Sequence, residues 1–215
     1  MKYSLFLKSR PDERESVRDK HAKLVKESES APSEWRISPD ASSKLPPFRD
    51  SLLTTMDLRP YLEGPYKGRV GYVFREGLSD TGADDDFLNL EFDSEKVDFN
   101  EIVKRVLPIY IEAFRAYRAQ IGPDELIDVD FDDDDVDERH DIYRLHVVNY
   151  FDAELIRRAF QYPIEEIVDR LSRAKVEVII IKKGLLIALA RHAMRVDELL
   201  DANVRIRRFL GEWQR

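Results

Sequence analysis

RVGYVFRE (residues 69–76) and FLNLEFD (residues 87–93) both alternate apolar and polar side chains. Such alternation is typical of a strand with one face toward a core and the other toward water. The segment that joins them, GLSDTGADDD, contains two glycines and suits a turn. We therefore expect the two strands to pair as an antiparallel hairpin. A second hairpin is predicted at VEVIIIKKGLLIALA (176–190), where two apolar runs flank a Lys-Lys-Gly turn.

Helices are predicted between and after these hairpins. The longest, DFNEIVKRVLPIYIEAFRAYRAQIG (98–122), has Asp98 at the N-cap position, one apolar face, and Gly122 at its end. Pro108 lies inside this helix and is expected to bend it. Three further helices are predicted at residues 153–160, 163–174 and 195–213.

The predicted elements follow the order β, irregular, ββα, then βααββα, with additional strands at 3–8 and 141–152. Residues 28–50 form the irregular part, because they are rich in proline and serine, and Trp35 is expected to anchor them. Adjacent strands are joined mostly by hairpins instead of helical crossovers. This arrangement predicts an α+β fold, with mainly antiparallel sheet and packed helices.

The chain length of 215 residues suits one domain, residues 1–215, or two lobes at residues 1–122 and 123–215. There are no cysteines, which excludes disulfides, thiolate catalysis and cysteine-ligated metals. No segment approaches the roughly 18 apolar residues that cross a bilayer, and the first residues do not read as a signal peptide. We therefore expect a cytoplasmic protein.

The formal net charge of −8 is unevenly distributed. Residues 1–75 carry 15 basic and 11 acidic groups, residues 76–141 carry 6 and 22, and residues 142–215 carry 14 and 10. The middle segment thus holds the whole excess of negative charge. Such a field repels nucleic acid and anionic membranes, and it attracts cations or basic proteins.

The densest acidic run is DVDFDDDDVDE (128–138). It is predicted to begin as a strand, DVDFD, which turns Val129 and Phe131 inward and a row of carboxylates outward. One reading is a solvated loop or a charged edge strand, and another is a docking surface for a basic partner. A weak cation site is the third. The carboxylates of the predicted docking surface are Asp84, Asp85, Asp86, Asp128, Asp130, Asp132, Asp133, Asp134, Asp135, Asp137 and Glu138.

Catalytic and cofactor motifs are absent from the sequence. The glycines form no phosphate-binding motif, and neither GxSxG nor HExxH occurs. An EF-hand loop that starts at Asp128 or Asp130 would place aspartate where the bend requires glycine. The histidines have no metal-ligand spacing, and His146, in an apolar run, is expected to be structural. We therefore predict a protein that is not an enzyme and that has neither a cofactor nor a specific metal site.

The layout of the chain and three segments, GPYKGRVGYVF (64–74), YRLHVVNYFDAELIRRAF (143–160) and GLLIALA (184–190), resemble one family. These are the immunity proteins of bacterial polymorphic-toxin and type VI secretion systems, in particular those paired with restriction-endonuclease-like nuclease toxins. The resemblance implies a non-enzymatic inhibitor that binds a cognate toxin and blocks it.

The excess of negative charge in residues 76–141 agrees with that mechanism, because a row of aspartates can replace substrate phosphates in the basic cleft of a nuclease. The expected partner is a toxin with a basic surface. An adaptor for another basic partner and a divalent-cation-dependent enzyme of an unrecognised type are the alternatives. A homodimer through the hairpin at 176–190 is a further prediction, although burial within the chain would explain that hairpin equally well.

Overall fold

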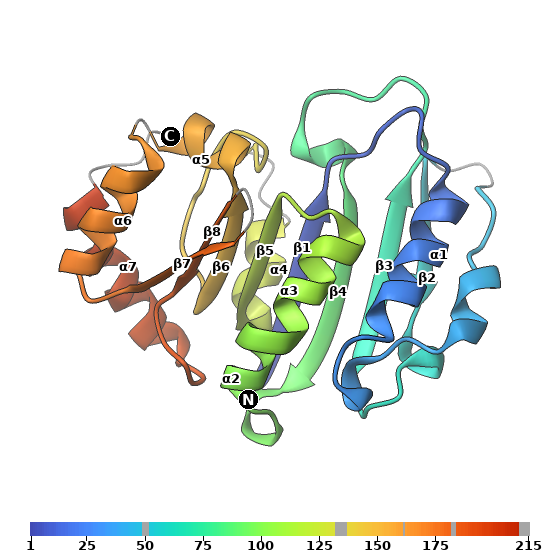
Figure 1. Cartoon of the computed structure of the whole chain (residues 1–215), viewed down its shortest axis with the longest axis horizontal. Coiled ribbons are helices and arrows are strands. Elements are labelled where there is room, and N and C mark those ends of the chain that lie inside the picture. Colours follow the sequence, from blue (N-terminus) through green and yellow to red (C-terminus); the bar gives the residue numbers. More distant parts are fainter. Residues whose placement is uncertain (49–51, 132–136, 161, 182–183, 211–215) are drawn as a thin grey trace.

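The computed structural model describes residues 1–48, 52–131, 137–160, 162–181 and 184–210. These residues form one eight-stranded antiparallel sheet with the order β2-β3-β4-β1-β5-β6-β8-β7 (Figure 1). The predicted α+β class is therefore confirmed. The strands are β1 (Lys2–Ser9), β2 (Leu53–Asp57), β3 (Lys67–Val73), β4 (Asp86–Asp93), β5 (Arg118–Pro123), β6 (Val148–Asp152), β7 (Glu177–Ile181) and β8 (Gly184–Ala188).

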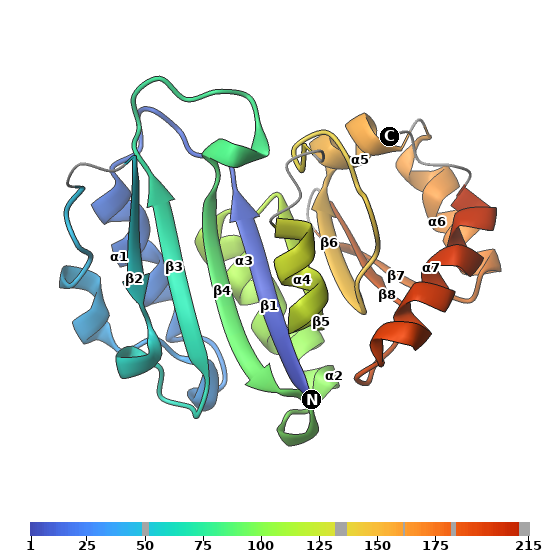
Figure 2. The same cartoon turned by 180° about the vertical axis from the view of Figure 1, so that it is seen from behind.

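Helices surround the sheet unevenly. Their bounds are α1 (Val17–Ser28), α2 (Phe99–Glu101), α3 (Leu107–Phe114), α4 (Asp124–Phe131), α5 (Ala153–Ala159), α6 (Ile164–Arg173) and α7 (Val196–Leu210). Helices α1 and α3 cover one side of the half formed by β1 to β4, and α4 lies on the other side, over β1 and β5 (Figure 2). Helices α6 and α7 lie at the end of the sheet that β7 and β8 form, away from α1.

One part of the sheet has a bare surface, which we name the open face. It is the side of β2, β3 and β4 that points away from α1 and α3, and none of the described helices lies over it in Figure 2. Alternation along the strands directs charged side chains such as Asp57, Lys67 and Arg69 to this side, and all three are exposed. The opposite side chains of the same strands, including Val70, enter the main core.

Both predicted hairpins are confirmed. Strands β3 and β4 pair antiparallel with Gly71 opposite Phe87, and β7 pairs antiparallel with β8, with Ile181 opposite Gly184. A single sheet runs through both predicted lobes, and its core consists of two large apolar clusters. The choice between one domain and two lobes stays a prediction.

The long helix predicted at 98–122 is wrong in its second half. Asp98 is the N-cap, and its carboxylate accepts a hydrogen bond from the Asn100 backbone N–H at 2.8 Å. A π-helical turn, Ile102–Val106, precedes Pro108, which cannot donate a backbone hydrogen bond. The helix then ends at Arg115, which has a φ of 53°. Strand β5 follows and is buried on both sides, including its polar residues Arg118 and Gln120, which alternate with Ala119 and Ile121.

The strand predicted at the start of the acidic run is also wrong, because residues 124–131 form α4. Asp124 and Glu125 occupy the first helical turn, where negative charge interacts favourably with the helix dipole. Ile127 faces inward against Phe6 and Phe87. Val129, which was expected inside, is 57% exposed.

The strand predicted at 141–152 is confirmed only for β6 (148–152). Residues 141–146 have no regular secondary structure, and their backbone is hydrogen-bonded to a side chain of α7. The Asn203 side chain accepts a hydrogen bond from the Leu145 N–H at 2.8 Å and donates one to the Leu145 carbonyl at 2.7 Å. A side-chain amide thus replaces a neighbouring strand at this position.

Trp35 anchors the irregular segment as predicted. It is buried and stacks on Tyr66 with 4.2 Å between ring centroids. Its carbonyl accepts a hydrogen bond from the Tyr110 hydroxyl of α3. The segment itself forms two short 3₁₀ turns, Ser33–Trp35 and Pro39–Ser43.

A buried histidine on α1 predicts how stability depends on pH. The His21 Nε2 atom lies 3.1 Å from the Ala41 carbonyl, which can only accept, so Nδ1 is left to accept from the Tyr72 hydroxyl at 3.1 Å. Burial lowers the pKa of His21 below its usual 6.5, and burial does the same to His146. The unfolded chain therefore binds protons that the folded chain does not as the pH falls through 6.5.

We expect the free energy of unfolding to fall below pH 6.5, by up to about 1.4 kcal/mol per pH unit for each such histidine. His21→Phe should reduce this slope between pH 6.5 and 5, measured by urea denaturation at several pH values. His192→Asn, at an exposed position, is the control and should leave the slope unchanged. An equal slope in the wild type and the His21 variant would contradict the assignment.

Candidate functional site

Two acidic segments far apart in sequence meet at one end of the sheet. The first is the loop 79–85 before β4, and the second is the segment 137–141 after α4; together we name them the loop junction. The Gly82 backbone N–H donates to the Asp137 carboxylate at 3.1 Å, which joins the two segments directly. The predicted acidic residues at 84–86 and at 137–138 are therefore neighbours in space.

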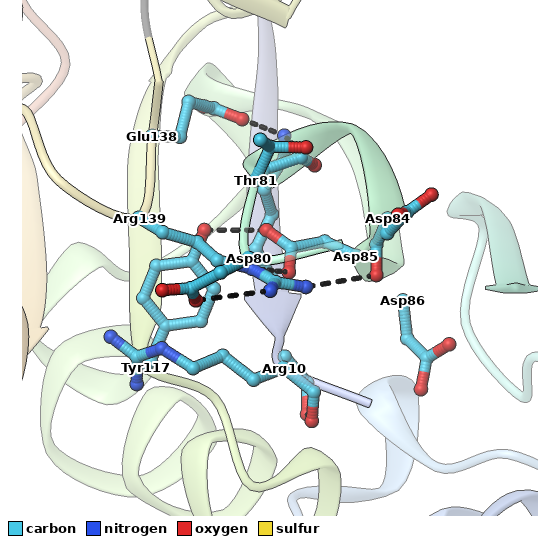
Figure 3. Close-up of polar contacts among 12 residues, drawn as sticks. Arg10, Asp80, Thr81, Asp84, Asp85, Asp86, Tyr117, Glu138 and Arg139 are labelled. Carbon is cyan, nitrogen blue, oxygen red and sulfur yellow. Dashed lines mark hydrogen bonds and ion pairs between the residues drawn. The ribbon is translucent and has the colours of Figure 1, made fainter. Parts of the chain in front are cut away.

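Arg139 holds the loop junction together (Figure 3). Its Nε atom donates to Asp85 Oδ1 at 2.8 Å, Nη1 to the Ser79 carbonyl at 2.9 Å, and Nη2 to the Asp84 carbonyl at 3.0 Å. The Tyr117 hydroxyl donates to the other oxygen of Asp85. Burial raises the pKa of Asp85, and the Arg139 guanidinium opposes that shift by stabilising the carboxylate.

A second buried ion pair lies beside the first. The Lys8 ammonium contacts the Glu138 carboxylate, and both side chains are almost wholly inaccessible to water. Arg118 donates to the Glu138 and Asp141 carbonyls, each at 3.1 Å. Burial lowers the pKa of Lys8 to about 8, since desolvation disfavours its charged form.

Asp86 points to the opposite side of the sheet from Asp85 and faces α1. The Arg75 guanidinium donates to both of its oxygens, at 2.8 and 2.7 Å, and the Lys20 ammonium donates at 2.7 Å. The Val73 N–H adds a fourth bond at 3.0 Å. Lys20 also donates to Ser9 at 2.7 Å, so this cation is fully committed inside the protein. The Asp86 cluster thus joins the start of the β3–β4 loop, at Arg75, to the start of β4, and it is separate from the Asp85–Arg139 pair.

The carboxylates of the predicted docking surface fall into distinct groups. Buried in the ion pairs above are Asp85, Asp86 and Glu138. Asp130 is mostly buried and contacts Arg144 and the fully buried His146, whose structural role stays a prediction. Half-buried at the loop junction are Asp84 and Asp137, and Asp128 on α4 is exposed. Outside the described residues are Asp132, Asp133, Asp134 and Asp135. Their role in partner binding stays a prediction.

A cavity of about 490 Å³ opens beside the loop junction, at the end of the open face. One wall is apolar and the other carries carboxylates. The apolar wall is formed by Leu52, Leu53, Val73, Phe74, Leu78 and Phe87. The charged groups in the lining are Lys8, Glu76, Asp84, Asp85, Asp130, Asp137 and Glu138.

Two of the cavity carboxylates are stabilised in their ionised form. The Ser79 hydroxyl and N–H both donate to Asp84 and lower its pKa. Burial by itself would raise the pKa of Asp137. Hydrogen bonds from the Arg139 and Gly82 backbone N–H groups and from His140 outweigh burial, so the pKa of Asp137 is lowered as well. Both side chains are therefore anionic at neutral pH.

The cationic partners of this site were missed in the sequence. Arg139 is the only lysine or arginine between Arg118 and Arg144, within the most acidic part of the chain. Because a buried carboxylate requires a counter-charge, a lone cation in such a run is a signal for an internal ion pair. Within the described ranges, no group of three or more His, Asp or Glu is placed to hold a metal ion. The helices in these ranges are also too short or too polar to cross a membrane.

Comparison with known proteins shows a likeness of fold. No protein-family model matches the sequence, and no curated protein is similar to it in sequence. Among solved structures, the chain is similar to the Pseudomonas aeruginosa T6SS protein PA0821, with a TM-score of 0.53 and 11% identity. The likeness covers 99% of this chain and 76% of the other. At this identity, what the two proteins share is the fold.

Proposed function

We propose that this chain is an immunity protein that binds and neutralises a cognate toxin, without catalysing a reaction. The observation that carries the proposal is the likeness over 99% of the chain to a protein of the type VI secretion system (T6SS). The family resemblance of the sequence points to the same system. The toxin would be a nuclease with a basic surface, and the neutralisation would take place in the cytoplasm.

The loop junction and the adjacent open face are the surface that we propose for the toxin. Asp84 and Asp137 are anionic there, and Asp80 is 70% exposed beside them. Asp85 and Glu138 are buried and do not contact the toxin in this proposal. Their ion pairs hold the loop 79–85 against segment 137–141. A surface fixed before binding loses less conformational entropy when the complex forms.

Stoichiometry tests this function directly. Toxin encoded beside this gene should lose its nuclease activity at an equimolar amount of the chain, in a titration with a fluorescent nucleic-acid substrate. An enzyme that destroyed the toxin would act at a small fraction of that amount. Full neutralisation at a hundredth of the toxin concentration, or none at excess, would contradict the proposal.

Salt should affect the rate of association more than the rate of dissociation. Opposite charges steer the encounter, and this steering weakens as the Debye length shrinks from roughly 14 to 7 Å between 50 and 200 mM salt. Surface plasmon resonance at both concentrations would measure the two rates. An association rate that does not change with salt would remove the electrostatic part of the proposal.

A further inference from the structure

We propose that the cavity beside the loop junction receives a long cationic side chain, an arginine or a lysine, that the toxin inserts. This inference rests on the proposed function, and it names the chemistry of the contact. It follows from the two unlike walls of the cavity.

The apolar wall suits the hydrocarbon stem of such a side chain. Leu53 is 39% exposed and Phe74 is 37% exposed, so both retain apolar surface that a partner can cover. Phe87 forms the floor and lies directly over Gly71, where an added Cβ atom would approach its ring to 2.3 Å. The absence of a side chain at Gly71 therefore allows the Phe87 ring to lie against the sheet.

The opposite wall suits the cationic head. Among the described residues of the lining, Lys8 is the one lysine or arginine, and Glu138 neutralises it. Asp85 is likewise neutralised by Arg139, and Asp130 by Arg144. Three carboxylates of the lining have no lysine or arginine side-chain contact among the described residues, and these are Glu76, Asp84 and Asp137.

The whole cavity is therefore apolar on one side and negatively charged on the other. Lysine and arginine have this same division, because their methylene stems are apolar and only their ends are charged. An uncharged apolar side chain would leave these three carboxylates without a counter-charge, and an acidic one would be repelled. The volume of about 490 Å³ also accommodates part of the segment that carries the side chain.

The test is an NMR titration of the ¹⁵N-labelled full chain with N-acetyl-arginine-N-methylamide. We expect amide shift changes at residues 76–87 and 137–138, with a dissociation constant in the millimolar range. The citrulline analogue has nearly the same shape without the charge, and we expect it to bind at least about tenfold more weakly. Equal binding of the two analogues, or shift changes confined to other regions, would overturn the proposal.

Two variants test the charged side and the apolar side of the cavity separately. Glu76→Gln should weaken arginine binding several-fold, whereas Glu165→Gln, an exposed position on α6, should leave it unchanged. Leu53→Ala should also weaken binding, with Leu200→Ala, an exposed leucine of α7, as its control. Both pairs lie at exposed or partly exposed positions, so circular dichroism should show folded protein in each case. Unchanged binding in both Glu76 and Leu53 variants would overturn the proposal.

The same variants distinguish this inference from the proposed function. If the wild type neutralises the toxin and Glu76→Gln and Leu53→Ala bind the toxin equally well, the cavity is not the contact and only the inference fails. If the chain selects arginine over citrulline but does not neutralise the toxin, the proposed function fails and the cation preference of the cavity is supported.

Discussion

Replacing Arg139 with methionine should lower the free energy of unfolding by about 3–5 kcal/mol, because it leaves a buried carboxylate without its counter-charge. Asp85 is 5% exposed and would retain the Tyr117 hydroxyl and the charge of Lys8, which is already paired with Glu138. The carbonyls of Ser79 and Asp84 would lose their donors at the same time. Urea denaturation followed by circular dichroism measures the loss.

Arg59→Met is the matched control for this variant. Arg59 pairs with Asp57 at 2.9 Å, but both side chains are more than half exposed. Exposed pairs contribute about 0–1 kcal/mol, so the control should differ little from the wild type. A cost for Arg139→Met as small as that of the control would mean that water enters the loop junction and solvates Asp85.

Replacing Asp86 with asparagine should have a similarly large effect, about 3–5 kcal/mol. The carboxylate is fully buried and accepts from Lys20, Arg75 and the Val73 N–H. Asparagine keeps the shape but removes the charge, so the two cations would lose their shared counter-charge, and the more distant Glu15, 4.0 Å from the Lys20 ammonium, would compensate only in part. The Lys20 pKa is already lowered by burial, and Asp86 is the main group that opposes this shift.

Asp93→Asn is the control, at the other end of the same strand. Asp93 contacts the N-terminal amine and Lys96 near the surface, where water screens the pairs, so its loss should cost far less than the loss of Asp86. Adding Lys20→Met to Asp86→Asn should recover part of the lost stability, because it removes one uncompensated charge. Strictly additive costs in this double-mutant cycle would contradict a direct interaction between Lys20 and Asp86.

Local patterns predicted the elements whose residues contact their own neighbours in the chain. The hairpins at β3–β4 and β7–β8 were found because each has alternation or apolar runs around a turn. The helix prediction failed at 118–123 because β5 pairs with β1 and β6, which lie far away in sequence. The polar residues of β5, Arg118 and Gln120, are too few for their alternation with Ala119 and Ile121 to separate this short strand from the end of a helix.

The site was predicted in composition but not in its internal structure. The sequence shows a strong excess of carboxylates, and the two acidic segments do meet in space. It does not show that Asp85 pairs with Arg139, 54 positions away, or that Asp86 pairs with Lys20, 66 positions away. Such partners follow from tertiary structure, so a count of charges overestimates how many carboxylates a partner can reach.

The position of β1 at the centre of the sheet has a consequence for synthesis. This strand is made before either neighbour, and its neighbours are residues 86–93 and 118–123. Tyr3, Leu5 and Leu7 therefore leave the ribosome long before anything can cover them. Contacts that span so much chain form slowly and expose the nascent protein to aggregation. We expect fragments that stop before residue 118 to depend on chaperones for solubility.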